Sequence, residues 1–82
     1  MPDTELLERI TATSNVLAGK PVIRGTRLSV EFILNLLAHE TTPAEIMSEY
    51  PGLTPEDIRA CLLFASRSLE SVEFMPLMAE PA

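Results

Sequence analysis

Cysteine, tryptophan and positive charge are scarce in this sequence. Its 82 residues include one cysteine and no tryptophan, and 6 Lys and Arg stand against 12 Asp and Glu, which gives a net charge of −6. A single cysteine excludes an intrachain disulfide, so a reducing compartment is expected. The acidic balance has the wrong sign for a protein that holds nucleic acid over its whole surface.

Long apolar runs are also absent. The longest, residues 60–65, is far shorter than the roughly 20 residues that cross a bilayer. Residues 1–5 lack the basic start and apolar core of a signal peptide, so we expect a cytoplasmic protein without membrane contact. A domain this small, with few aromatic residues and no disulfide, is only marginally stable alone. We therefore expect a homodimer or a larger homo-oligomer.

Two helix starts are the clearest local signals. Residues 42–45 (Thr-Pro-Ala-Glu) and 54–57 (Thr-Pro-Glu-Asp) each place Thr at the N-cap, Pro at the first helical position and a carboxylate at the third. Pro51-Gly52 ends the first of these helices. The second can continue to about residues 71–74. Its predicted buried face consists of apolar residues at helical spacing, namely Ile58, Cys61, Leu62, Ala65, Leu69 and Val72.

The segment before these helices predicts another helix and a small sheet. Residues 30–39 form a helix that is apolar nearly all round, with Ser29 as its N-cap, which favours a central position or cover by a second chain. Residues 22–23 and 26–28 are β-prone and flank Gly25, which indicates a hairpin with Gly25 at positive φ. The β-branched residues near Ile10 can add a third strand.

The order of these elements predicts one mainly α domain. Residues 30–73 are expected to form a homeodomain-like three-helix unit with a helix-turn-helix arrangement. Residues 10–29 precede it as a small β-hairpin or short antiparallel sheet. Residues 74–82 contain two prolines and no periodicity, and are expected to be a mobile tail.

The positive charges gather in one place. Lys20, Arg24 and Arg27 lie in a stretch without acids, while every other part of the chain is net negative. The helix that would read DNA begins instead with Glu56 and Asp57, although base reading usually needs Arg, Lys, Asn or Gln there. We therefore regard Lys20, Arg24 and Arg27 as candidate nucleic-acid or partner contacts, with solvated surface charge as the alternative.

Nothing in the sequence predicts an enzyme, a cofactor or a metal site. Lys20 is followed by Pro21, which lacks a backbone donor, so the segment is a poor phosphate-binding loop. His39, the only histidine, stands at a helix end and is expected to cap it. Cys61 lies in an apolar run and is expected to be buried rather than nucleophilic. No catalytic set can be assembled from these residues.

Two motifs make the sequence recognisable. Residues 19–27 (Gly-Lys-Pro-Val-Ile-Arg-Gly-Thr-Arg) and 50–58 (Tyr-Pro-Gly-Leu-Thr-Pro-Glu-Asp-Ile) resemble the domain-of-unknown-function family numbered 433, over residues 10 to about 69. The resemblance implies a homeodomain-like trihelical domain, and a small bacterial protein often encoded beside a PIN-like nuclease. It also implies kinship with VapB-type antitoxins. Leu28-Ser29 departs from the proline that many relatives carry before the first helix, and Ser29 can cap that helix instead.

The resemblance favours one function and leaves two alternatives. The leading expectation is an antitoxin-like protein that binds a PIN-like nuclease toxin. The first alternative is a dimeric helix-turn-helix regulator that binds DNA, and the second is a module that only oligomerises. A tail that becomes ordered on contact is a common way to cover a partner's groove. The apolar residues of the tail are its candidate contacts, namely Phe74, Met75, Leu77 and Met78.

Overall fold

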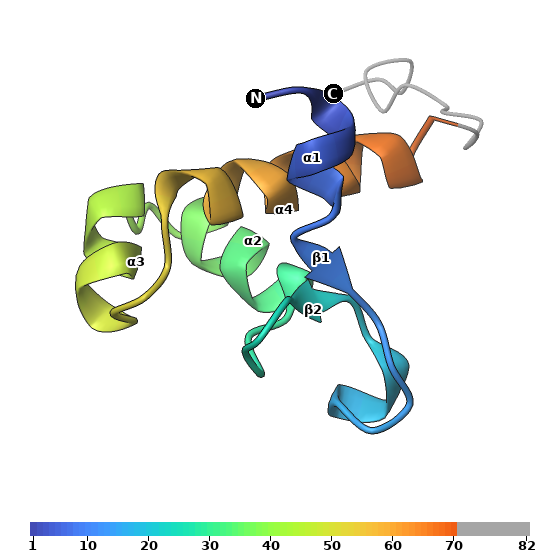
Figure 1. The fold of residues 1–82 in the computed structure, drawn as a ribbon. Coiled ribbons are helices and arrows are strands. Elements are labelled where there is room, and N and C mark those ends of the chain that lie inside the picture. Colours follow the sequence, from blue (N-terminus) through green and yellow to red (C-terminus); the bar gives the residue numbers. More distant parts are fainter. Residues whose placement is uncertain (71–82) are drawn as a thin grey trace, which may run out of the picture.

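The computed structural model describes residues 1–70, which form four α-helices and one short sheet (Figure 1). The elements in chain order are α1 (Asp3–Leu7), β1 (Ile10–Thr11), the 3-10 turn η1 (Leu17–Gly19), β2 (Val22–Ile23), α2 (Val30–Ala38), α3 (Pro43–Glu49) and α4 (Pro55–Ser68). The predicted fold class is confirmed, because α2, α3 and α4 follow a short antiparallel sheet. The tail predicted at residues 74–82 lies outside the described residues.

The two strands of the sheet are not the pair that the sequence predicted as a hairpin. β1 pairs antiparallel with β2, with Ile10 opposite Ile23. The predicted strand at residues 26–28 does not form, and this side of β2 carries only an isolated bridge between Val22 and Ser29. The antiparallel sheet is therefore present, but the residues near Ile10 supply its second strand.

Thr26 accounts for the missing strand. Its hydroxyl donates to the carbonyl of Ile23 at 2.7 Å and accepts from the N–H of Leu28 at 3.0 Å. These side-chain bonds close a turn in place of a continuous ladder. Gly25 lies in that turn with φ at +80°, as the hairpin prediction required.

The predicted caps are all present. Ser29 accepts from the N–H of Phe32 at the start of α2. Thr42 and Thr54 each begin a complete capping box, with Glu45 and Asp57 as the returning carboxylates of α3 and α4. Each box satisfies two backbone N–H groups that have no partner within the helix.

The buried face of α4 differs from the prediction. Ile58 and Cys61 are buried as expected, but Leu62 is 49% exposed and Leu69 is 63% exposed, so both were wrongly assigned to the core. Ala60 is fully buried instead. The reason is α1, which packs along α4 with Leu6 buried, and an exposed ion pair between Arg67 and Asp3 at 2.8 Å also links the two helices. Contact with α1 turns the buried sector toward Ala60 and away from the two leucines.

The core lies where α4 crosses the other elements. α1, α2, α3 and β1 all pack against α4, which runs along the top of the molecule in Figure 1. The largest fully buried side chains come from the sheet and three different helices, namely Val22, Ile23, Ile33, Ile46 and Cys61. None of the helices in residues 1–70 has the length and apolar character that spanning a bilayer requires.

Candidate partner-binding groove

An apolar groove of about 630 Å³ opens at the N-terminal end of α2. Four segments supply its walls: η1, the turn after β2, the first turn of α2 and the end of α3. Most of the lining is apolar, from Leu17, Ala18, Leu28, Phe32 and Tyr50. Lys20 and Arg27 line the same groove, so an apolar floor is combined with two cations.

Phe32 and Tyr50 form an aromatic wall of this groove. Their ring centroids are 5.9 Å apart and their planes meet at 83°, an edge-to-face contact. Phe32 stays 38% exposed. An exposed aromatic ring held in place by a second ring is typical of a surface that binds another molecule.

The opposite wall is built on strained backbone. Leu17 and Ala18 have φ at +47° and +56°, a conformation that costs side-chain-bearing residues on the order of 1 to 3 kcal/mol each. The strained turn leaves Leu17 38% exposed at the groove. Strain that holds an apolar side chain at a surface points to a functional use of that surface.

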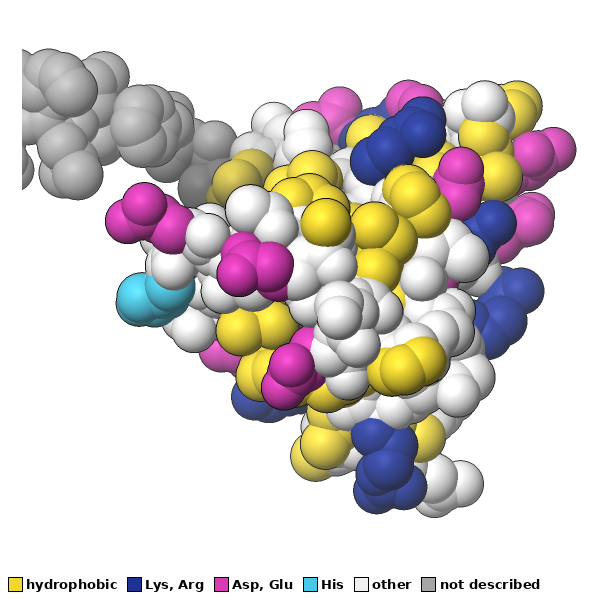
Figure 2. Space-filling model, turned by 90° about the vertical axis from the view of Figure 1, so that its left-hand side faces the viewer, with side chains coloured by type: hydrophobic (Ala, Val, Ile, Leu, Met, Phe, Trp, Pro, Cys, Tyr) yellow, Lys and Arg dark blue, Asp and Glu magenta, His cyan; other side chains and the backbone are white. Residues whose placement is uncertain are grey.

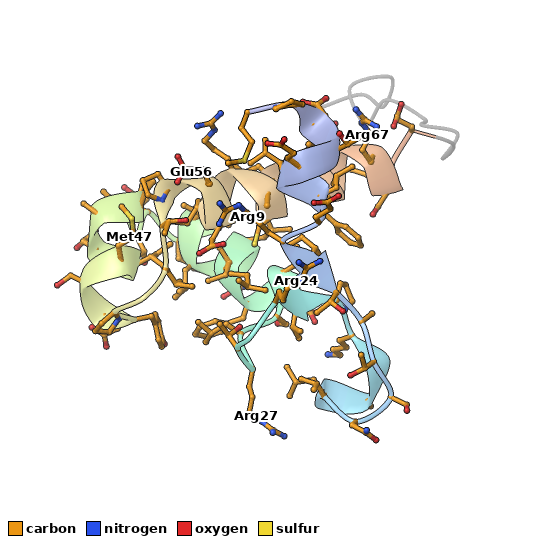
Figure 3. All side chains as sticks on the ribbon, in the orientation of Figure 1. Arg9, Arg24, Arg27, Met47, Glu56 and Arg67 are labelled. Carbon is orange, nitrogen blue, oxygen red and sulfur yellow. The ribbon has the colours of Figure 1, made fainter. Side chains whose placement is uncertain are left out.

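The three candidate cations do not form one patch. Lys20 and Arg27 share the groove, and Lys20 also makes an exposed ion pair with Glu31 at 3.0 Å. Such a pair contributes little to stability, so Lys20 remains available to a ligand. Arg24 lines a separate hollow, and Figure 3 shows Arg24 and Arg27 leaving the turn in different directions. The structure therefore brings together two of the three predicted residues.

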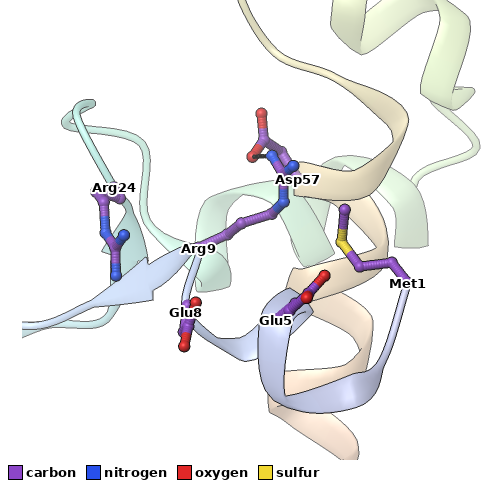
Figure 4. A pocket seen from close by; sticks show the side chains of 6 residues that line it. All are labelled: Met1, Glu5, Glu8, Arg9, Arg24 and Asp57. Carbon is purple, nitrogen blue, oxygen red and sulfur yellow. Dashed lines mark hydrogen bonds and ion pairs between the residues drawn. The ribbon is translucent and has the colours of Figure 1, made fainter.

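That second hollow holds an ion pair that the sequence did not predict. Arg9 reaches across to Asp57 at 3.0 Å, beside Glu8 and Arg24 (Figure 4). The same carboxylate accepts from the N–H of Thr54 at 3.0 Å. Asp57 is thus engaged within the molecule, at the start of the helix that would have to read DNA. No local pattern could reveal Arg9, which lies 48 positions from its partner.

His39 and Cys61 take the structural positions that were expected of them. His39 ends α2, and its Nδ1 lies 2.7 Å from the carbonyl oxygen of Asn35. Cys61 is fully buried, and this burial raises the pKa of its thiol to about 12. The thiol is therefore protonated and inaccessible near neutral pH. Within residues 1–70 no three His, Cys, Asp or Glu side chains gather as metal ligands would.

The predicted tail contacts lie beyond the described part of the chain. They are Phe74, Met75, Leu77 and Met78. The groove residues Leu17, Phe32 and Tyr50 were missed by sequence reasoning, because they come from three separate segments. The one available signal was the position of Phe32 outside the main apolar stripe of its helix.

Comparison with known proteins agrees with this fold. The family model described as "Protein of unknown function (DUF433)" matches residues 10–65. A crystal structure of a DUF433 member from Anabaena variabilis is 30% identical in sequence, with a TM-score of 0.73. The match covers 82% of this chain and 66% of that chain, just under two thirds of the relative's length. No match was found among curated proteins. The chain belongs to the DUF433 family.

Proposed function

We propose that this protein is an antitoxin-like binding protein whose partner is a PIN-like nuclease toxin. The observation that carries the proposal is the groove, in which Leu17 and Phe32 are each 38% exposed beside Lys20 and Arg27. Apolar side chains of this size, kept at the surface by strained backbone and an aromatic contact, favour burial by another protein. The choice of a nuclease as partner rests on the family's resemblance to VapB-type antitoxins.

Charge supports the same type of partner. A nuclease that cleaves RNA needs a cationic substrate groove, and a chain with a net charge of −6 complements that field. On the face shown in Figure 2, acidic side chains are widely spread, and Lys and Arg lie mainly around its margin. The net charge would attract such a nuclease at long range, and Lys20 and Arg27 in the groove would lie against an acidic part of its surface.

The first turn of α4 disfavours sequence-specific DNA binding as the main role. It carries Glu56 and Asp57, and Asp57 is tied to Arg9. α1 also packs along this helix, which would have to enter the major groove. The DNA-binding regulator and the purely oligomerising module therefore remain secondary proposals.

Co-purification with a PIN-like nuclease, taken from the neighbouring gene where that gene encodes one, tests the proposal. The wild-type protein should form a stable complex and suppress RNA cleavage by the nuclease. Phe32→Glu should weaken that complex at least tenfold, because it places a charge on the aromatic wall. Ala44→Glu, which places the same charge on an exposed residue of α3, is the matched control and should bind normally. Equal binding by Phe32→Glu and wild type would remove the groove from the interface.

A shortened chain separates the groove from the tail. A chain that ends at Glu70 keeps the whole groove and lacks the tail residues Phe74, Met75, Leu77 and Met78. If both elements contact the nuclease, shortening should weaken the complex further in the Phe32→Glu background. If neither change affects binding or RNA cleavage, neither the groove nor the tail contacts the nuclease. A wild-type protein that neither binds nor inhibits the nuclease would contradict the antitoxin-like role.

A further inference from the structure

Two large apolar side chains, one in α4 and one at its C-cap, have no place in the core. Leu62 is 49% exposed and Leu69 is 63% exposed. They lie two helical turns apart, so they share one face, and the exposed Ser66 lies between them. In Figure 1, α4 runs along the edge of the molecule, with α1 against one flank. The leucines therefore form an outward face with no cover among residues 1–70.

Opposite charges stand at the two ends of this face. Arg59 lies one turn before Leu62, and Glu70 directly follows Leu69; both charged residues are exposed. Among residues 1–70, the side chain of Glu70 has only a long contact with Arg67, at 3.6 Å and with both side chains exposed. The face thus has a positive end, an apolar middle with a small residue, and a negative end.

We propose that this face binds the same face of a second copy, with the two α4 helices antiparallel across a two-fold axis near Ser66. A two-fold interface is self-complementary, so a contact from residue i to residue j is repeated from j to i. In this register Leu62 of each copy packs against Leu69 of the other. Arg59 of each copy then faces Glu70 of the other.

Charge selects the antiparallel arrangement. A parallel pair would place Arg59 beside Arg59 and Glu70 beside Glu70, and like charges at close range oppose association. Ser66 has a small side chain, which lets the helix axes approach to the roughly 8–10 Å of packed helices. One pair of 14-residue helices buries less than a standard interface, so the dimer should dissociate reversibly in the micromolar range.

Sedimentation velocity over a concentration series tests the apolar part of the interface. Wild type should change from monomer to dimer as concentration rises, and Leu62→Glu/Leu69→Glu should stay monomeric. Both positions are exposed, so circular dichroism of the variant should match that of wild type. Ala44→Glu places the same charge on an exposed residue of α3 and should dimerise as wild type does.

A charge exchange tests the register. Arg59→Glu should weaken the dimer at least tenfold, because it sets two acids against each other, twice per dimer. Arg59→Glu/Glu70→Arg should restore the dimer by exchanging the two ends. Arg67→Ala, which removes the intrachain contact of Glu70, should leave the dimer intact.

Three results would overturn the proposal. The first is a wild-type monomer at several hundred micromolar. The second is a dimer that survives Leu62→Glu/Leu69→Glu, or an exchange variant as weak as Arg59→Glu alone. The third is a chain ending at Glu70 that dimerises where the full chain does not, since this would assign the face to the protein's own C-terminal residues.

Discussion

The carboxylate of Asp57 joins the start of α4 to the N-terminal segment, and its removal should destabilise the whole domain. One oxygen accepts from the Arg9 guanidinium and the other from the N–H of Thr54, each at 3.0 Å. The side chain of Asp57 is 10% exposed and that of Arg9 is 33% exposed. The pair is therefore shielded on the acid side, and the guanidinium keeps partial access to water.

The expected loss can be estimated from these contacts. A hydrogen bond to a charged group contributes about 1.5 to 3 kcal/mol, and access of Arg9 to water places this pair near the lower end. Loss of a helix cap costs about 1 kcal/mol. Asp57→Ala should therefore lower the free energy of unfolding by roughly 2 to 3 kcal/mol. Asp57→Asn keeps an acceptor for Thr54 and should lose about half as much.

Urea denaturation followed by circular dichroism measures these losses. Glu45→Ala is the matched control, because Glu45 closes the same capping box in α3 but is exposed and has no ion pair among the described residues. Its loss should be smaller. A double-mutant cycle with Arg9→Met should give a coupling energy of about 1 kcal/mol with Asp57→Asn. An Asp57→Ala protein no less stable than Glu45→Ala would refute the role of the Arg9 contact.

Three further measurements test other features. Gly25→Val should lower the free energy of unfolding, measured by thermal denaturation, by about 1 to 3 kcal/mol, because φ is +80°. Gly25→Asn should lose less, since Asn tolerates this φ and a Cβ would meet no neighbour within 4 Å. Equal stability of Gly25→Val and wild type would contradict the turn. Cys61 should resist a thiol reagent at pH 8 until the protein unfolds, and rapid labelling of the native thiol would contradict its burial. The free energy of unfolding should fall between pH 9 and 12, because the thiol loses its proton at a lower pH in the unfolded protein than in the folded one. Wild type should show no duplex DNA binding at physiological salt, and any binding at low salt should disappear in Arg24→Ala/Arg27→Ala; binding that survives this substitution would place the contact on α4.

The parts of the fold that the sequence predicted are those set by neighbouring residues. Thr42 and Thr54 cap helices through bonds to residues three positions away, so a short motif contains the whole interaction. Gly25 needed its positive φ for a turn of similar span. Ser29 caps α2 through a bond of the same span, to the N–H of Phe32.

The errors arise where distant segments decide the outcome. Helical spacing placed Leu62 and Leu69 in the core, but α1 covers the neighbouring flank of α4 and leaves both leucines outside. No local pattern in α4 predicts that contact, which joins residues as far apart as Arg67 and Asp3, 64 positions away. The groove also depends on distant segments, because Leu17 and Phe32 line it together only after the sheet and α2 have formed.

The contacts of the N-terminal segment oppose the DNA binding for which three-helix units of this kind are often used. A three-helix unit reads DNA when the first turn of its last helix is free and carries donors for bases and phosphates. Here that turn carries two acids, and Arg9 uses its guanidinium to bind one of them. The ion pair that stabilises the domain therefore occupies the end of α4 that DNA would need. The groove with Lys20 and Arg27 lies on elements outside α4, and its apolar lining suits a protein better than a nucleic acid.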